Sequence, residues 1–193
     1  MTSSRFENIL ATFCSPALMG KKVSNLVSVS KEEVPEVSTL VNSYNQKLNR
    51  HDIKIKKVCE CGERILLLVY REELLRNHLL TSEIREILMN YGYSKSNTID
   101  EDLEILGRKM QKIKFPHEIG VFLGYPLSDV QGFIENKGRN YKYCGYWKVY
   151  KDTQEAQKIF SMYDDLKNFM VSELDYGRNL DNIIGQFQNI NIA

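Results

Sequence analysis

The sequence predicts an α+β fold, with a small and mainly antiparallel sheet of about four strands packed against several helices. Two short runs rich in β-branched and aliphatic residues, 53–58 and 64–70, flank a turn that contains Gly62, which is typical of a β-hairpin. Segments with helical spacing are grouped between the predicted strands instead of alternating with them. The chain also lacks the glycine-rich phosphate loops of nucleotide-binding α/β folds. These observations argue against a doubly wound parallel sheet.

The first fifty residues are predicted to form a helix, a strand and a second helix. An apolar stripe indicates a helix over 5–13, which the Ser15-Pro16 step should interrupt. Residues 23–29 are short and β-branched, as expected of a strand. A second apolar stripe predicts a helix ending near Leu48, which begins at Pro35 or, with a capping box, at Ser30.

The elements after the hairpin follow from spacing and capping signals. We expect helices over 71–80, 81–91 and 98–113, two short helices within 116–138, and helices over 152–174 and 180–187. Thr98 and Glu101 form a capping box at the start of the third helix. Residues 143–150 alternate as a fourth strand, with Trp147 on one face and Lys148 and Tyr150 on the other.

The composition predicts one cytoplasmic domain over residues 1–193 that needs no disulfide to fold. The chain is 42% hydrophobic, and its 26 basic and 25 acidic residues leave a net charge of +1, so no global field directs it to nucleic acid or to a membrane. The longest apolar run, 65–70, is far too short to span a bilayer, and the N-terminus has no uninterrupted signal-peptide core. In that compartment the four cysteines are expected as free thiols.

Three stretches of the chain together resemble one protein family. They are CSPALMGKK at 14–22 with Asn25-Leu26, the segment 116–134 that begins PHEIGVFLGYP, and GYWKVY at 145–150 followed by Asp152 and Ala156. In this order and spacing they are similar to the bacterial domain-of-unknown-function family 3793, small proteins of anaerobic Gram-positive bacteria. The resemblance extends from about Phe6 to the long C-terminal helix. It implies a bacterial cytosolic protein of similar length and brings no activity, substrate or cofactor with it.

One functional hypothesis is a thiol-dependent enzyme. Cys14 precedes Ser15-Pro16 and a candidate helical turn, and the dipole at a helix N-terminus lowers the pKa of a thiol. His117 would act as the base, with Glu118 or Asn25 orienting it. The competing interpretation is a buried cysteine that closes the first helix, with His117 as a cap beside Pro116.

The leading hypothesis is binding of a small anionic molecule that contains a ring. Residues 137–151 hold five basic and five aromatic side chains and no acidic one. Basic groups hold an anionic group while aromatic faces stack on a ring. The competing interpretations are an ordinary half-buried strand with a solvated edge, and an aromatic surface that binds a protein partner. The candidate ligand-binding residues are Lys22, Asn25, Arg139, Trp147, Lys148 and Tyr150.

DNA binding and a metal site are not expected. Residues 119–134 imitate a helix-turn-helix, but Asp129 and Glu135 in its second helix would repel phosphates. Cys59 and Cys61 flank a single residue, and no other pair in the chain has the spacing of metal ligands. No particular cofactor or protein partner is indicated.

Overall fold

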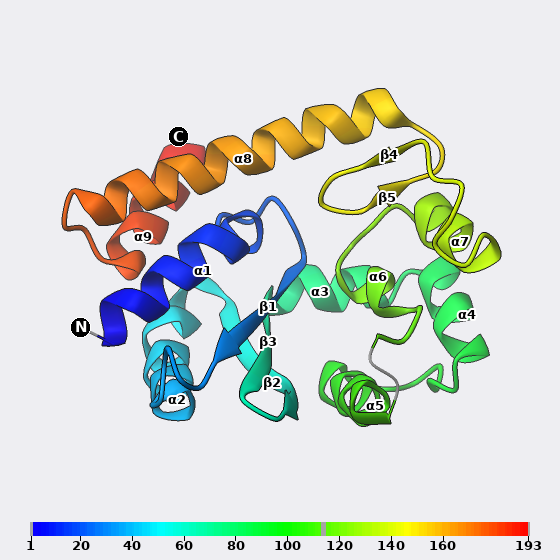
Figure 1. The fold of residues 1–193 in the computed structure, drawn as a ribbon, viewed down its shortest axis with the longest axis horizontal. Helices are drawn as coiled ribbons and strands as arrows, with labels where there is room; N and C mark the ends of the chain where they lie inside the picture. The colour runs from blue at the N-terminus through cyan, green and yellow to red at the C-terminus, as the bar shows by residue number, and fades with distance from the viewer. Residues whose placement is uncertain (1, 113–114, 193) are drawn as a thin grey trace.

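The computed structural model describes residues 2–112 and 115–192 and has the predicted α+β architecture (Figure 1). The first part contains α1 (Thr2–Leu18), β1 (Ser24–Ser30), α2 (Val37–Leu48), a 3-10 turn (Asn49–His51), β2 (Ile53–Cys61) and β3 (Arg64–Arg71). It is followed by α3 (Glu72–Leu79), α4 (Ser82–Asn90), α5 (Ile99–Lys112), α6 (Ile119–Phe122), α7 (Leu127–Glu135), β4 (Tyr143–Cys144), β5 (Lys148–Val149), α8 (Thr153–Asp175) and α9 (Leu180–Ile192).

The three longer strands form an antiparallel sheet in the order β1-β3-β2. The predicted hairpin is confirmed, because β2 and β3 pair along their length and Gly62 in the turn has φ +56°. In the register, Leu67 of β3 lies between Val27 of β1 and Lys57 of β2. A bulge between Lys57 and Cys59 shifts the pairing near the turn.

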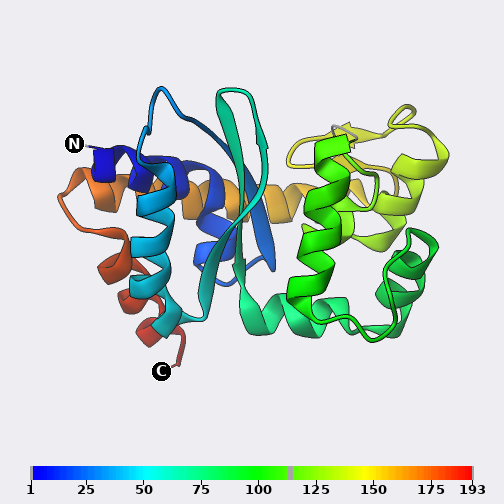
Figure 2. The ribbon, with the colours of Figure 1, turned by 90° about the horizontal axis from the view of Figure 1, so that it is seen from below.

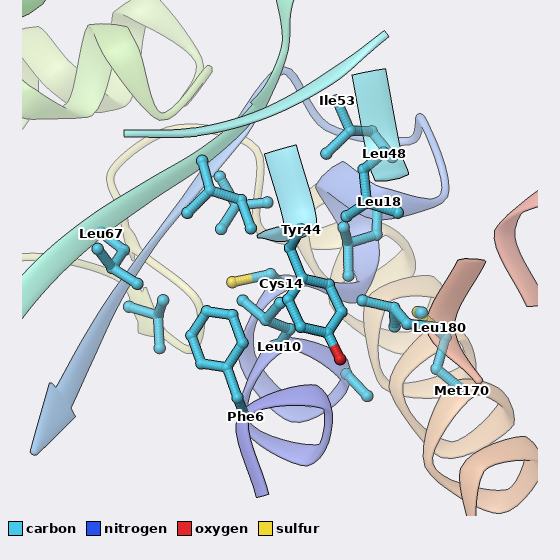
Figure 3. Close-up of a cluster of buried hydrophobic side chains, with 14 of the residues drawn as sticks. Phe6, Leu10, Cys14, Leu18, Tyr44, Leu48, Ile53, Leu67, Met170 and Leu180 are labelled. Carbon is cyan, nitrogen blue, oxygen red and sulfur yellow. The ribbon is translucent and has the colours of Figure 1, made fainter. Parts of the chain in front are cut away.

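Helices lie on both faces of the sheet (Figure 2), and alternating residues of β3 belong to two separate cores on these faces. Ile65, Leu67 and Val69 pack in a cluster with α1, α2, α8 and α9, part of which is drawn in Figure 3. Leu68 and Tyr70 pack in a second cluster with helices α3 to α7. Because both faces of the sheet are covered by helices, side chains on both sides of β3 are buried. This explains why residues 65–70 form a continuous hydrophobic run.

Helix α1 does not end at Pro16, contrary to the sequence prediction. It continues to Leu18, and Pro16 lies inside it. The Ser15 hydroxyl donates to the carbonyl of Ala11, and the N–H of Ala17 donates to Oδ1 of Asn25 at 3.1 Å. These side-chain bonds and the burial of this turn stabilise a helix that the proline alone would interrupt.

Residues 143–150 form a two-stranded hairpin instead of one strand. Cys144 of β4 pairs with Lys148 of β5, and the N–H of Gly145 donates to the carbonyl of Trp147 at 3.1 Å across the turn. Alternation alone does not distinguish a strand from two short strands that reverse at a glycine. Gly145 is required here because a Cβ would lie 2.4 Å from the Phe160 ring of α8.

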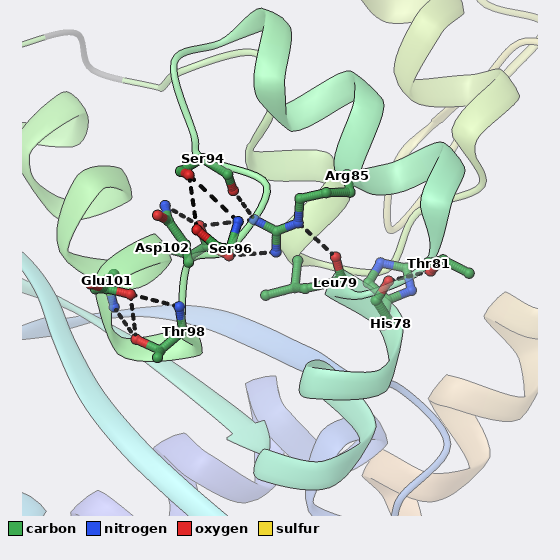
Figure 4. Close-up of polar contacts among 10 residues, drawn as sticks. His78, Leu79, Thr81, Arg85, Ser94, Ser96, Thr98, Glu101 and Asp102 are labelled. Carbon is green, nitrogen blue, oxygen red and sulfur yellow. Dashed lines mark hydrogen bonds and ion pairs between the residues drawn. The ribbon is translucent and has the colours of Figure 1, made fainter.

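The capping box at the start of α5 is confirmed (Figure 4). The N–H of Thr98 donates to Oε2 of Glu101 at 2.7 Å, and the N–H of Glu101 donates back to Oγ1 of Thr98 at 3.3 Å. Beside it, the guanidinium of Arg85 in α4 donates to both carboxylate oxygens of Asp102 in α5, at 2.7 and 3.2 Å. The ion pair is buried, and each partner makes a further hydrogen bond: Arg85 to the carbonyl of Leu79, and Asp102 from the side chain of Asn97. It therefore fixes the position of α4 against α5.

Helix α8 runs along one side of the molecule and connects its two ends (Figure 1). Its middle and C-terminal parts pack in the first core, through Leu166 and Met170. Its first turns carry Ala156, Phe160 and Tyr163, which pack against Trp147 and Val149 in a third, smaller cluster. The β4–β5 hairpin therefore lies between α8 and α7. Within the described residues, no helix combines the length and apolar character needed to cross a membrane.

Candidate functional site

A pocket of about 330 Å³ lies between the β4–β5 hairpin and the segment that contains α6 and α7. This volume is within the range of small-molecule sites, and the walls are mostly apolar, as in such sites. The side chains that line it include Phe115, His117, Ile119, Tyr125, Asp129, Phe133, Tyr146, Trp147 and Lys148. Two of the three stretches that carry the family resemblance, 116–134 and 145–150, therefore meet at one pocket.

Aromatic rings form a connected wall on the hairpin side of the pocket. Tyr125 stacks on Trp147 with ring centroids 5.2 Å apart and an interplanar angle of 28°. On α8, the Phe160 ring meets Trp147 edge-on at 4.5 Å. The hydroxyl of Tyr125 donates to the carbonyl of Tyr146 at 3.2 Å, which fixes the loop before α7 to the hairpin turn. Rings held in this way offer flat surfaces without further loss of side-chain entropy.

Asp129 in the first turn of α7 holds the hairpin in place. Its Oδ2 accepts a hydrogen bond from Nε1 of Trp147 at 2.8 Å. Its Oδ1 accepts from the N–H groups of Tyr150 at 2.8 Å and Lys151 at 3.2 Å. The carboxylate is buried and has no basic side chain paired with it among the described residues. Its charge is balanced by these donors, so both oxygens are already engaged within the wall of the pocket.

Two basic side chains contribute to the lining. Nζ of Lys148 donates to the carbonyl of Gly138 at 2.7 Å and lies 5.7 Å from the ring centroid of Phe133. The His117 ring is tilted against the same phenylalanine, with centroids 5.8 Å apart. His117 is exposed, and its ring makes no hydrogen bond within the described part of the chain. The structure therefore brings His117, Trp147 and Lys148 together from two distant stretches.

Two other predicted ligand-binding residues lie outside the lining. Arg139 is exposed in the segment before β4. The ring of Tyr150 packs on α7, where a Cβ on Gly132 would approach its Cγ to 2.5 Å. The Tyr150 hydroxyl is shielded from solvent and has no hydrogen-bond partner within residues 2–112 and 115–192. Tyr150 therefore acts in packing the hairpin on α7.

Lys22 and Asn25 are buried, and neither lines the pocket. Asn25 accepts the N–H of Ala17 and so fixes the end of α1 to β1. Nζ of Lys22 lies 5.0 Å from the ring centroid of Tyr125 and 6.0 Å from that of Tyr163 in α8. Burial lowers the pKa of Lys22 to about 8, an effect that the neighbouring Cys14 thiol partly opposes.

The structure does not form the predicted Cys14–His117 pair. Cys14 lies one turn before the C-terminal end of α1, not at a helix N-terminus, and is fully buried in the cluster with Phe6 and Leu10 (Figure 3). Burial raises the pKa of its thiol, although Lys22 lowers it. His117 lines the pocket on the far side of the sheet, where Cys14 takes no part.

Glu118 belongs to a separate buried network. Its Oε1 accepts from Nζ of Lys109 at 2.5 Å and from the hydroxyl of Tyr93 at 3.3 Å. No hydrogen bond joins it to His117 in the described ranges, so it does not orient that ring. Its role is to anchor the segment before α6 to α5.

The four cysteines are free thiols in the structure. Cys59 is buried on β2, whereas Cys61 and Cys144 are exposed. Among residues 2–112 and 115–192, no group of three or more histidine, cysteine or acidic side chains is arranged to hold a metal ion.

Sequence reasoning missed Tyr125, Phe133 and Asp129 as components of the site. Asp129 was interpreted as an exposed charge that repels phosphates, but it faces inward. The available signal was the spacing in α7: Asp129 lies beside Val130 and three residues before Gly132, on the face of the helix that is buried. A carboxylate that is buried on such a face is expected to have hydrogen-bond donors as partners.

Comparison with known proteins places the chain in a family and gives no activity. A family model described as "Protein of unknown function (DUF3793)" matches residues 10–184. No curated protein and no solved structure matches the chain. Because the family model covers nearly the whole of the 193 residues, including all three stretches of the predicted resemblance, the chain belongs to the DUF3793 family.

Proposed function

We propose that this protein binds a small, flat, anionic molecule in the pocket between the β4–β5 hairpin and α6–α7. The observation that carries the proposal is the convergence of His117 and Lys148 on a pocket whose walls are aromatic. A ring would lie against Trp147 or Phe133, and the anionic group would lie near the two basic side chains. Pockets of this kind combine apolar burial with a few polar groups that fix orientation.

The charge around the pocket supports an anion over a cation. Asp129 lines the pocket, but Trp147 and two hairpin N–H groups already occupy its oxygens. Lys148 has a carbonyl and no carboxylate as its hydrogen-bonding partner in the described residues. An arriving carboxylate would replace that neutral acceptor with a charged one, which strengthens a hydrogen bond by about 1 kcal/mol or more.

The test uses a matched pair of probes, 2-naphthoate and 2-naphthamide, which share a ring and differ in charge. Titration calorimetry should give an affinity for the naphthoate about tenfold higher than for the amide, because the charged hydrogen bond contributes about 1.4 kcal/mol. Trp147 is the only tryptophan of the chain, so its indole N–H signal in a nitrogen–proton NMR spectrum reports on the pocket directly. That signal should shift on addition of naphthoate.

Two lysine variants of the hairpin separate a specific site from general attraction. Lys148→Met should reduce the affinity for naphthoate to that for the amide, because Lys148 lines the pocket. Lys142→Met removes an exposed charge of the same hairpin that is not part of the lining, and should leave the affinity unchanged. Equal binding of both probes, or a Trp147 signal that does not move, would contradict the proposal.

A second candidate function is binding of a protein partner through the aromatic surface near the pocket. Phe115, Tyr141 and Tyr143 are 56%, 44% and 38% exposed, which is unusual for aromatic side chains from one region. Sedimentation velocity at rising protein concentration tests self-association. If the wild type associates and the double variant Tyr141→Ser, Tyr143→Ser does not, the surface acts as an interface.

The proposed setting is the bacterial cytoplasm. All four cysteines are free, including the exposed pair Cys61 and Cys144, and exposed thiols are maintained in reducing compartments. The thiol-enzyme alternative has weaker support, since Cys14 is buried and its pKa is raised. Trapping of a covalent intermediate at Cys14 would support the thiol-enzyme alternative.

A further inference from the structure

Lys22 is a buried cation without a counter-charge. The residue is 7% exposed, and it makes no ion pair or hydrogen bond through its ammonium within the described residues. The neighbours of Nζ are Tyr125 in the loop before α7, Tyr163 in α8 and Cys14 in α1. Other buried basic groups differ in this respect: Arg85 pairs with a carboxylate, and Arg71 donates to three backbone carbonyls. Two tyrosine faces attract a cation but leave its three N–H donors unused.

The amine also retains an opening to solvent. Among the described residues, the Tyr150 hydroxyl is the only shielded side-chain nitrogen or oxygen that lacks a hydrogen-bond partner. Nζ of Lys22 has no such partner either, so a small part of its surface remains open to solvent. An amine that is largely desolvated, unpaired and not fully shielded has the environment of a nucleophilic lysine.

We propose that Lys22 is a reactive amine that takes a small aldehyde or ketone as its ligand. The neutral amine adds to the carbonyl carbon, and the C=O π bond breaks to give a carbinolamine. Loss of water then forms the C=N bond of an imine, so that one amine and one carbonyl compound yield one imine and one water molecule. The site is distinct from the naphthoate pocket and shares only the Tyr125 ring with it.

The lowered pKa of Lys22, caused mainly by burial, increases the supply of the neutral nucleophile. With a pKa of about 8, about one quarter of Lys22 amines are neutral at pH 7.5, against about one in a thousand for an ordinary lysine. Lys21 is adjacent in sequence, exposed, and provides an internal control.

The experiment is reductive trapping of the full-length protein with glyoxylate and cyanoborohydride at pH 7.5. Cyanoborohydride reduces the imine to a stable secondary amine, and peptide mass spectrometry locates the modified lysines. We expect Lys22 to be modified at least about tenfold faster than Lys21, since the larger neutral fraction outweighs its restricted access. In urea, where burial is lost, the two lysines should react at similar rates.

The outcome is decided on the wild-type chain, so no variant needs to fold for the test to be valid. Modification of Lys22 at or below the rate of Lys21 in the folded protein would overturn the proposal. A preference for Lys22 that persists unchanged in urea would also overturn it, because it would then come from local sequence. Lys22→Arg keeps the charge, should lose only the Lys22 modification, and confirms the assignment of the peptide.

Discussion

The Asp129 carboxylate accepts three hydrogen bonds and connects α7, Trp147 and the strand after the hairpin turn. Asp129 therefore holds the hairpin and α7 in the arrangement that forms the pocket. Replacing one acceptor oxygen by an NH₂ group places a donor against existing donors and leaves buried N–H groups without partners.

We therefore expect Asp129→Asn to reduce the free energy of unfolding by about 2–4 kcal/mol and to move the Trp147 indole signal. Urea denaturation and the nitrogen–proton spectrum measure the two effects. The matched control is Asp152→Asn at the exposed N-cap of α8, where asparagine caps as well as aspartate. If the two variants lose similar stability, the inferred role of Asp129 is wrong.

Cys14 shows how burial alone changes the chemistry of a thiol. Because burial raises its pKa, Cys14 stays protonated, and because it is enclosed it is inaccessible to reagents. At pH 7.5 iodoacetamide should alkylate the exposed Cys61 and Cys144 and leave Cys14 unmodified until the chain unfolds. Mass spectrometry of native and urea-treated protein gives the answer; rapid native alkylation of Cys14 would support the thiol-enzyme alternative.

At the scale of elements, the contact between α7 and the hairpin depends on a missing side chain. Gly132 lies in the middle of α7, where alanine would normally stabilise a helix by about 1 kcal/mol. Here its Cβ would lie 2.5 Å from Cγ of Tyr150, so the helix and the hairpin must separate. Gly185 in α9 is also helical, but the nearest atom to its Cβ is Cε1 of His51 at an ordinary 3.4 Å.

The two glycines are thus expected to respond in opposite directions. Gly132→Ala should reduce the free energy of unfolding by about 1–3 kcal/mol, because overpacking outweighs helix propensity. Gly185→Ala should increase it by about 0.5–1 kcal/mol. Chemical denaturation of both variants tests this, and a stabilising Gly132→Ala would show that the α7–hairpin contact is looser than described.

The whole molecule determines the environment of Lys22, because α1, the loop before α7 and α8 come together around it. Its pKa is lower in the folded chain, about 8, than the 10.5 of an exposed lysine. Below pH 8, Lys22 is charged in both states, and the folded state pays the full free-energy cost of desolvating its ammonium group. As the pH rises from 8 towards 10.5, the folded chain releases its proton first and the penalty disappears, so stability increases.

Lys22→Met should remove this dependence. The difference in stability between wild type and variant should shift in favour of the wild type by about 3 kcal/mol from pH 7.5 to pH 10.5. The comparison uses the difference because the tyrosines also titrate at the upper end of this range. Lys21→Met serves as the control and should follow the wild type; a parallel course for both variants would contradict the lowered pKa.

The secondary structure was largely predictable because it depends on neighbours in the sequence. Thr98 and Glu101 cap α5 as expected, and Gly62 closes the β2–β3 hairpin with a positive φ. The two errors arose where distant residues decide the outcome. Asn25 and the surrounding core stabilise α1 across Pro16, and Phe160 of α8 requires the glycine at which β4 turns into β5.

The site was predictable in part. Trp147, Lys148 and His117 were identified by residue type and do line one pocket, whereas Cys14, Arg139 and Tyr150 were identified by the same reasoning and do not. Residue type indicates what a side chain can do when it is accessible. It carries no information on which face of a helix or hairpin is covered.

The sequence by itself determined the α+β class, most of the helices, the first hairpin and the family, because these follow from periodicity, capping and motif spacing. Tertiary structure alone decided that Asp129 is a buried clamp, that Cys14 is enclosed, and that Lys22 lies between two tyrosines. The physical reason is that desolvation and hydrogen-bond partners depend on which surfaces meet, and those surfaces come from different elements of the fold, as with Lys22, Tyr125 and Tyr163.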